Sequence, residues 1–240
     1  MARHGLAHGW GYRIGFSYPR IVSTGGDITV ANQWLEQRHW SMLHEAYSCA
    51  ESAYPSFGWN ETDNNSPDYF AGYDYVLVEV TMVTPFMLSW TEEGVTGCGN
   101  TPPQNYWRFL TLDLETARPL DMRLIFKGWV PEPDGDVETT LEIARSAPER
   151  FVWGPDEELF DFVRRHRRPH SDPRLEAKCD WDRLIRHHLA FGFRQSREVR
   201  FVLDRLPSVM QACAYELYSA PIDQLKPLLA HTATRYFYGL

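Results

Sequence analysis

Three pieces of one stretch decide the fold: YVLVEVTMVTPFMLSW at 75–90, the turn GCGNTPPQN at 97–105, and YWRFLTLDLETARPLDMRLIF at 106–126. The two flanking pieces alternate large apolar residues with polar ones, which is typical of half-buried antiparallel strands. Central strands are therefore predicted over 75–90 and 106–114. The stretch contains no nucleophile–base pair, no metal-spaced ligand set and no phosphate-binding loop, so it favours a binding protein over an enzyme.

Weaker patterns on both sides predict the remaining elements. Alternation predicts strands at Tyr12–Ile21, Glu198–Asp204 and Tyr215–Ser219. A helix is predicted over Asp27–Ala50, with Asp27 as its cap. Its apolar face is expected to comprise Ala31, Trp34, Leu35, Leu43, Ala46, Tyr47 and Ala50. Further helices are predicted at 137–147, 156–167, 180–189 and 221–229, a polar loop at Trp59–Pro67 and a turn at Pro131–Asp136.

This mixture of hairpin-linked strands and helices predicts an α+β fold, a twisted antiparallel sheet flanked by helices. The 240 residues are expected to form a single domain, with a possible N-terminal part at 1–70 and a C-terminal part at 71–240.

Composition narrows the class of partner and the location. The formal net charge of -8 argues against nucleic acid, which binds through Lys and Arg contacts to phosphates. An acidic surface favours a basic partner instead. The sequence has no apolar run long enough to cross a membrane and no signal-peptide core at its start. The chain is therefore expected to be either cytoplasmic or a mature form whose native signal peptide is absent.

The four cysteines are widely spaced and form no Cys-x-x-Cys pair. Cys49, Cys98, Cys179 and Cys213 therefore predict two disulfides in an oxidising compartment. Of the three possible connectivities, pairing Cys49 with Cys98 and Cys179 with Cys213 closes the shorter loops. Four buried free thiols are the alternative.

Other constellations are better explained by structure than by chemistry. The basic run 164–168 lies at a predicted helix C-terminus, where the helix dipole favours positive charge; an anion-binding patch is the alternative. Zinc-binding spacing is missing around His166 and His170, and Pro169 interrupts the helix between them. The acidic residues Glu79, Asp113, Glu115 and Asp121 are interpreted as strand and turn carboxylates, not a glycosidase pair. Neither a cofactor nor a metal is expected, and the chain is not expected to be an enzyme.

The Cys98–Trp107 loop is the predicted binding surface. Tyr106 and Trp107 face opposite ways on a strand, so one of them should lie outside the core. An aromatic anchor beside an adaptable polar loop is typical of a binding hot spot. The predicted binding residues are Asn100, Gln104, Asn105, Tyr106 and Trp107. Packing within the sheet is the alternative role of the two aromatics.

The order of short motifs resembles a bacterial extracytoplasmic domain family. That family occurs in lysozyme-sensing anti-sigma-factor ectodomains and beside peptidoglycan deacetylase domains. The resemblance rests on the Tyr-Pro strand end (16–21), the early helix residue Asn32, Leu88-Ser89, the turn DLETARPL (113–120) before Phe126, and PIDQLKPLL (221–229). The chain differs from the family pattern at Ala117, where a glycine is usual, and in the turn 98–105, which lacks the usual histidine.

The resemblance implies a periplasmic or extracellular, non-catalytic domain that recognises cell-wall enzymes or the wall itself. Two classes of function follow from it. The first is an inhibitor or immunity protein that binds a lysozyme-like or other wall-degrading enzyme or toxin. The second is a wall-glycan binding module or a peptidoglycan-modifying enzyme.

Overall fold

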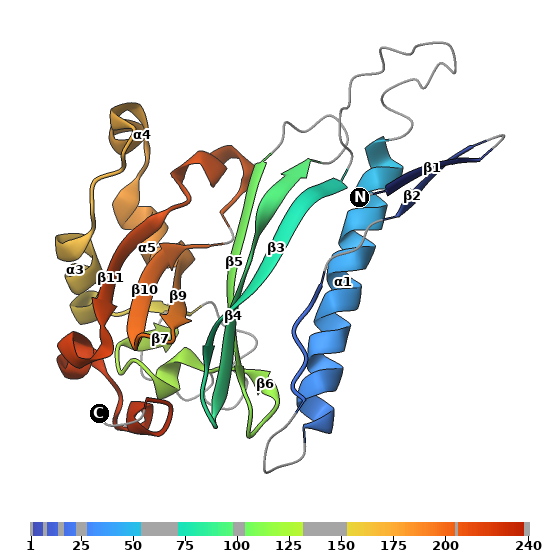
Figure 1. Ribbon diagram of the computed structural model, residues 1–240. Coiled ribbons are helices and arrows are strands. Elements are labelled where there is room, and N and C mark those ends of the chain that lie inside the picture. Colours follow the sequence, from blue (N-terminus) through green and yellow to red (C-terminus); the bar gives the residue numbers. More distant parts are fainter. Residues whose placement is uncertain are drawn as a thin grey trace. The chain divides into compact units, whose positions relative to one another are not determined.

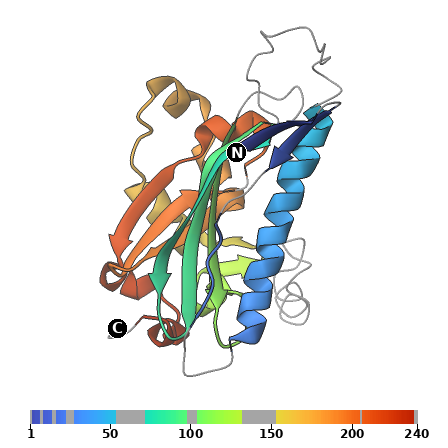
Figure 2. The ribbon, with the colours of Figure 1, turned by 45° about the vertical axis from the view of Figure 1, so that its right-hand side comes forward.

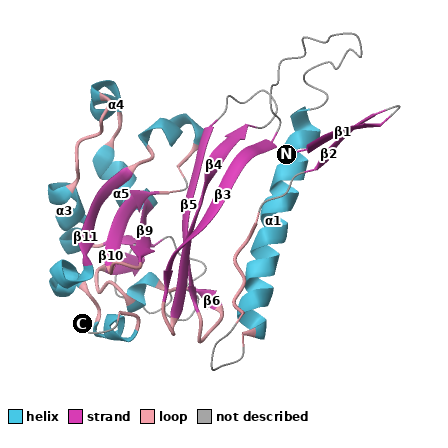
Figure 3. Cartoon of the chain, in the orientation of Figure 1, coloured by secondary structure: helices cyan, strands magenta, loops and turns pink. Residues whose placement is uncertain are grey.

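The computed structural model describes residues 2–6, 9–13, 17–22, 28–53, 72–97, 104–131, 153–204 and 206–237. Helices and antiparallel strands are mixed along the chain, so the predicted α+β class is confirmed (Figures 1 and 3). The chain divides into two compact units. The first comprises Met1–Val80 with Thr91–Arg108, and the second comprises Thr81–Trp90 with Phe109–Leu240.

The described helices vary widely in length, and α1 is the longest. They are α1 (Thr29–Ala53), α3 (Glu157–His166), α4 (Pro173–Lys178) and α5 (Trp181–His188), with 3-10 helices η2 (Met122–Leu124), η4 (Ser208–Cys213), η5 (Ile222–Leu228) and η6 (His231–Arg235). Figure 2 shows α1 as one unbroken helix. No helix in the described part of the chain has both the length and the apolar character to cross a membrane.

The strands that the structure describes form four small sheets. They are β1 (Ala2–Leu6), β2 (Gly9–Arg13), β3 (Gly72–Val83), β4 (Met87–Gly97), β5 (Gln104–Asp113), β6 (Arg118–Pro119), β7 (Trp129–Pro131), β8 (Trp153–Pro155), β9 (Leu189–Arg194), β10 (Glu198–Leu203) and β11 (Glu216–Pro221). The two larger sheets have the orders β3-β4-β5-β6 and β11-β10-β9, and the others are the pairs β1-β2 and β7-β8.

The predicted strand at 75–90 is wrong in one respect, because it is two strands joined by a tight turn. Pro85 has no backbone N–H to donate to a ladder, and it lies in this turn. The Thr84 hydroxyl accepts hydrogen bonds from the backbone N–H groups of Phe86 and Met87, at 3.2 and 3.0 Å. The strand predicted over 106–114 is confirmed as β5.

The predicted first strand at Tyr12–Ile21 is wrong in its second half. Tyr12 and Arg13 belong to β2, which pairs with β1, residues 14–16 lie outside the described residues, and 17–21 form no strand. The segment 17–22 makes no ladder, and the Asn32 side chain bonds both backbone polar groups of Ile21. Asn32 accepts from the Ile21 N–H at 2.9 Å and donates to the Ile21 carbonyl at 2.8 Å.

The second unit holds most of the described core. Strand β10 lies between β9 and β11, and its inward residues Val199, Phe201 and Leu203 are fully buried, as the alternation at 198–204 predicts. Helices α3 and α5 pack on this sheet and contribute Leu159, Val163, Leu184 and Ile185. Carboxylates begin both helices: Asp156 accepts from Leu159 N–H, and Asp180 from Arg183 N–H.

The predicted helices agree with the structure to different degrees. The helix predicted at 221–229 exists as the 3-10 helix η5, which contains Pro227. The helices predicted at 156–167 and 180–189 are confirmed as α3 and α5. The predicted helix at 137–147, the loop at Trp59–Pro67, the turn beyond Pro131 and the Asp27 cap lie outside the described residues.

Candidate functional site

The predicted binding loop lies mostly outside the described residues. This applies to Asn100 and to the side chains of Gln104, Asn105 and Tyr106, whose backbones belong to β5. Trp107 is half-buried in β5. The loop therefore remains a prediction, and the described residues direct attention to helix α1 instead.

One face of α1 is buried. Ala31, Leu35, Met42 and Ala46 are exposed by 3% or less and recur at four, seven and four residues, the spacing of one helical face. This face contains the predicted residues Ala31, Leu35 and Ala46. The prediction is wrong for Tyr47, which is 45% exposed.

A buried ion pair anchors the same face to strand β4. The Glu92 carboxylate is fully buried and accepts two hydrogen bonds from the Arg38 guanidinium, at 2.6 and 3.0 Å. The Tyr18 hydroxyl donates a third at 2.7 Å. A charge out of water needs this degree of pairing, because removing one partner leaves the other uncompensated, at a cost of about 3–5 kcal/mol. The pair therefore fixes the rotation of α1 about its own axis.

The segment 17–22 lies along α1 and braces it further. Besides the two Asn32 hydrogen bonds, Arg20 donates to the Asn32 carbonyl at 3.0 Å. The ring of Tyr18 stacks on His39 with centroids 5.5 Å apart. Tyr18 and Asn32, two of the residues that carry the family resemblance, thus both have structural roles in holding this helix.

The opposite face of α1 is an exposed, uncharged stripe. It consists of Val30, Gln33, Gln37, Trp40, His44 and Tyr47, here called the α1 stripe. These residues recur at alternating intervals of three and four, so they form one row along the helix. Val30 is 56% exposed, Trp40 63% and Tyr47 45%. A solvent-facing row with two large aromatics and no Asp, Glu, Lys or Arg is what a partner-binding helix presents.

Sequence reasoning missed this stripe because it assigned Tyr47 to the core and did not weigh Trp40. Counting intervals would have found it. The buried row recurs from Ala31 at four, seven and four residues, and the uncharged row recurs from Val30 at alternating intervals of three and four residues on the opposite face. Of these two rows, the first packs in the protein's own core and the second is exposed.

The candidate acidic residues have structural environments where they are described. Asp113 is buried and accepts from the backbone N–H groups of Glu115 and Thr116 and from the Tyr236 hydroxyl, at 2.8, 3.1 and 2.8 Å. Burial, and then the hydrogen bond to Asp113, raise the pKa of Tyr236 to about 12. Asp121 caps η2 through the Arg123 N–H. Glu79 is exposed on β3.

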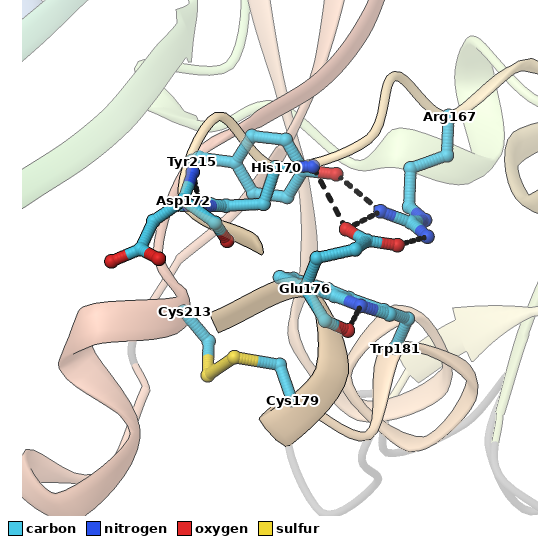
Figure 4. Close-up of a disulfide and its surroundings, with 8 residues drawn as sticks. All are labelled: Arg167, His170, Asp172, Glu176, Cys179, Trp181, Cys213 and Tyr215. Atoms are coloured by element: carbon cyan, nitrogen blue, oxygen red, sulfur yellow. Dashed lines mark hydrogen bonds and ion pairs between the residues drawn. A yellow bond between two sulfur atoms is a disulfide. The ribbon is translucent and has the colours of Figure 1, made fainter. Parts of the chain in front are cut away.

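The disulfide between Cys179 and Cys213 is present, which confirms half of the predicted pairing (Figure 4). Its Cα atoms lie 6.1 Å apart. The other predicted pair is not described, because Cys98 and the side chain of Cys49 lie outside the described residues. Within the described residues, there is no group of three or more His, Cys, Asp and Glu side chains that could hold a metal ion.

Comparisons with known proteins identify no family. Neither the protein-family models nor the curated proteins give a match. A solved structure of a member of the DUF3298 family from Bacteroides fragilis is similar at 15% identity, over 83% of this chain and 70% of that one, with a TM-score of 0.37. A likeness this distant carries no argument about activity.

Proposed function

We propose that this chain is a non-catalytic protein-binding domain that works in the periplasm or outside the cell. Its role is that of an inhibitor or immunity protein against a lysozyme-like or other wall-degrading enzyme or toxin. The observation that carries the proposal is the α1 stripe, an uncharged aromatic row on a helix whose other face is firmly anchored.

The stripe has the dimensions and chemistry of a helix that docks into a groove. From Val30 to Tyr47 it spans about 26 Å at 1.5 Å per residue. Trp and Tyr dominate binding hot spots because they bury a large area with few rotatable bonds. The Arg38–Glu92 anchor holds the helix in place before binding, which reduces the ordering cost of association.

Two further properties support the location and the partner. A disulfide such as Cys179–Cys213 persists in oxidising compartments such as the periplasm. The net charge of -8 favours association with a basic enzyme. The family resemblance to lysozyme-sensing ectodomains points to the same class of partner.

The test measures binding of the purified chain to lysozyme-like hydrolases by surface plasmon resonance, and to peptidoglycan by co-sedimentation. We expect Trp40→Ala/Tyr47→Ala to weaken hydrolase binding at least tenfold, because truncating a hot-spot aromatic often costs about 2 kcal/mol or more. The matched control is Val209→Ala, which truncates another exposed apolar side chain, 86% exposed, on η4. It should bind like the parent.

Three outcomes would overturn the proposal. Binding of the double variant equal to the parent would place the interface elsewhere, with the Cys98–Trp107 loop as the next candidate. Binding to peptidoglycan without binding to any hydrolase would favour the glycan-binding module. Release of soluble fragments or acetate from peptidoglycan by the pure chain would make it an enzyme.

A further inference from the structure

The segment 161–178 is positively charged, although the chain as a whole is negative. It includes the end of α3 and all of α4. It contains six Arg and Lys side chains and three Asp and Glu side chains, so it carries a net charge of +3 while the rest of the chain carries -11. A positive region on an acidic protein concentrates anions where the rest of the surface repels them.

Four of these cations have no ion-pair partner among the described residues: Arg165, Arg168, Arg174 and Lys178. Three of the four are arginines. The nearby carboxylates are already engaged. Asp161 pairs with Arg164 at 3.0 Å, and Glu176 pairs with Arg167. Asp172 accepts the backbone N–H of Arg174 at 2.8 Å. The Arg165 guanidinium reaches only the Asp161 carbonyl, and all three arginine side chains are exposed.

Hydrogen bonds centred on Glu176 hold the loop between α3 and α4 (Figure 4). Glu176 accepts from the Arg167 guanidinium at 2.5 and 2.8 Å and from the His170 N–H at 2.8 Å. These hydrogen bonds, led by that from Arg167, lower the pKa of Glu176 to about 2. The Arg167 guanidinium also lies over the Trp181 ring, 4.7 Å from its centroid.

The peptide of Arg168 is fixed on both sides. Its N–H donates to the Leu217 carbonyl of β11 at 2.8 Å, and its own carbonyl accepts from the Tyr215 hydroxyl at 2.5 Å. The Cys179–Cys213 disulfide joins the end of α4 to the end of η4. A loop this well fixed loses little further freedom when a ligand binds.

The helix dipole explains only part of the basic run. Arg164, Arg165 and His166 occupy the last turn of α3, where positive charge is favoured. Arg168 lies beyond the helix, and Arg174 lies in the first turn of α4, where a cation gains nothing from the dipole. These two positions require another explanation.

We propose that Arg165, Arg168 and Arg174 form a binding surface for a linear phosphate-bearing polymer. The guanidinium fork matches phosphate oxygens in pairs. A phosphate in a chain is tetrahedral, so its non-bridging oxygens can accept from forks that approach from different directions, whereas a carboxylate is planar and suits one fork. The surface is exposed and not enclosed, so it fits successive phosphates of a chain better than a single ion.

The test is isothermal titration of the full chain with short-chain polyphosphate. The matched variants are Arg165→Gln/Arg168→Gln/Arg174→Gln and Arg118→Gln/Lys127→Gln/Lys226→Gln, which lower the net charge equally. We expect the first variant to bind at least tenfold more weakly and the second to remain within about twofold of the parent. Parent binding should weaken as salt increases. Arg174→Gln alone should show a smaller loss, which keeps the test valid if the triple variant is unstable.

Several results would overturn this proposal. They are no binding by the parent, equal losses in the two triple variants, or polyglutamate of matched length binding as tightly as polyphosphate. The last result would assign the surface to an acidic polypeptide. Tighter binding to anionic lipid vesicles than to polyphosphate would assign it to a membrane surface. Because the α1 stripe is untouched by these variants, hydrolase binding should be unchanged whichever result is found.

Discussion

Ala117 has a backbone φ of 52°, a left-handed conformation that a side chain with a Cβ atom disfavours. It follows the Asx turn in which Asp113 accepts from the N–H groups of Glu115 and Thr116. Glycine, which has no Cβ atom, would adopt this conformation without strain. The sequence marks Ala117 only as a departure from the resembled pattern, and the structure shows that its backbone is left-handed.

Replacing Ala117 with glycine should therefore stabilise the protein. The relief of left-handed strain, about 1 kcal/mol, exceeds or offsets the extra freedom that glycine adds to the unfolded chain. We expect the free energy of unfolding in urea to rise by up to about 1 kcal/mol. The control Thr116→Gly, at a position with negative φ, should lower it. A lower value for Ala117→Gly would show that the strain is absent.

Glu176 gives the protein a defined pH dependence. Its pKa of about 2 in the folded chain lies below its ordinary value of 4.5, so its contribution to stability is complete above pH 4.5 and is lost as pH falls towards 2. In urea unfolding at pH 6 and pH 3, Glu176→Gln should lose less stability than the parent over this interval, by about 1 kcal/mol after discounting for solvent screening. The exposed control Glu158→Gln should follow the parent, and an unchanged slope in Glu176→Gln would refute the assignment.

Among the elements, β9 was not predicted. Its sequence, Leu189-Ala190-Phe191-Gly192-Phe193-Arg194, is an apolar run that ends in an arginine, and all six residues are buried or half-buried. Alternation is visible only when one face of a strand meets water, so a strand covered on both faces looks like the end of the preceding helix. Strands β5 and β10 have one wetter face, and both were predicted within two residues.

Gly192 of β9 is required for close packing against the ring of Phe109 in β5. A Cβ atom at this position would lie 2.6 Å from Cδ1 of the buried Phe109 ring. Gly192→Ala should therefore destabilise the protein by about 1–3 kcal/mol, because overpacking forces the ring or the strand to move. Combined with Phe109→Ala, which removes the obstacle, the substitution should cost much less. Strict additivity in this double-mutant cycle, measured by urea unfolding, would refute the clash.

At the scale of the whole molecule, the class of fold and one disulfide followed from the sequence, and the candidate interface did not. The α+β class needs only the periods of the hydrophobic pattern. The α1 stripe is recognised from the exposed fractions of its side chains. Tyr47 has the right spacing for the core, and only its 45% exposure excludes it from the core. Likewise, the basic run was assigned to the helix dipole because the engagement of Asp161, Asp172 and Glu176 by other groups cannot be read from sequence.

Removing the Cys179–Cys213 disulfide should weaken the whole fold. The bond links residues 34 positions apart and restricts the unfolded chain, so Cys179→Ala/Cys213→Ala should lower the free energy of unfolding by about 2–4 kcal/mol. Chemical denaturation without reductant measures this. Mass spectrometry that finds both thiols free in the parent would contradict the bond itself.

Photo-crosslinking from α1 tests the central claim most directly. A photoreactive phenylalanine analogue replaces His44 in the α1 stripe, Val209 on η4, or Tyr106 in the predicted loop, and each chain is irradiated with a lysozyme-like hydrolase. We predict that the chain labelled at 44 forms a covalent complex and the chain labelled at 209 does not. Crosslinking at 106 or 209 but not at 44, with binding intact, would contradict the assignment of α1 as the docking face.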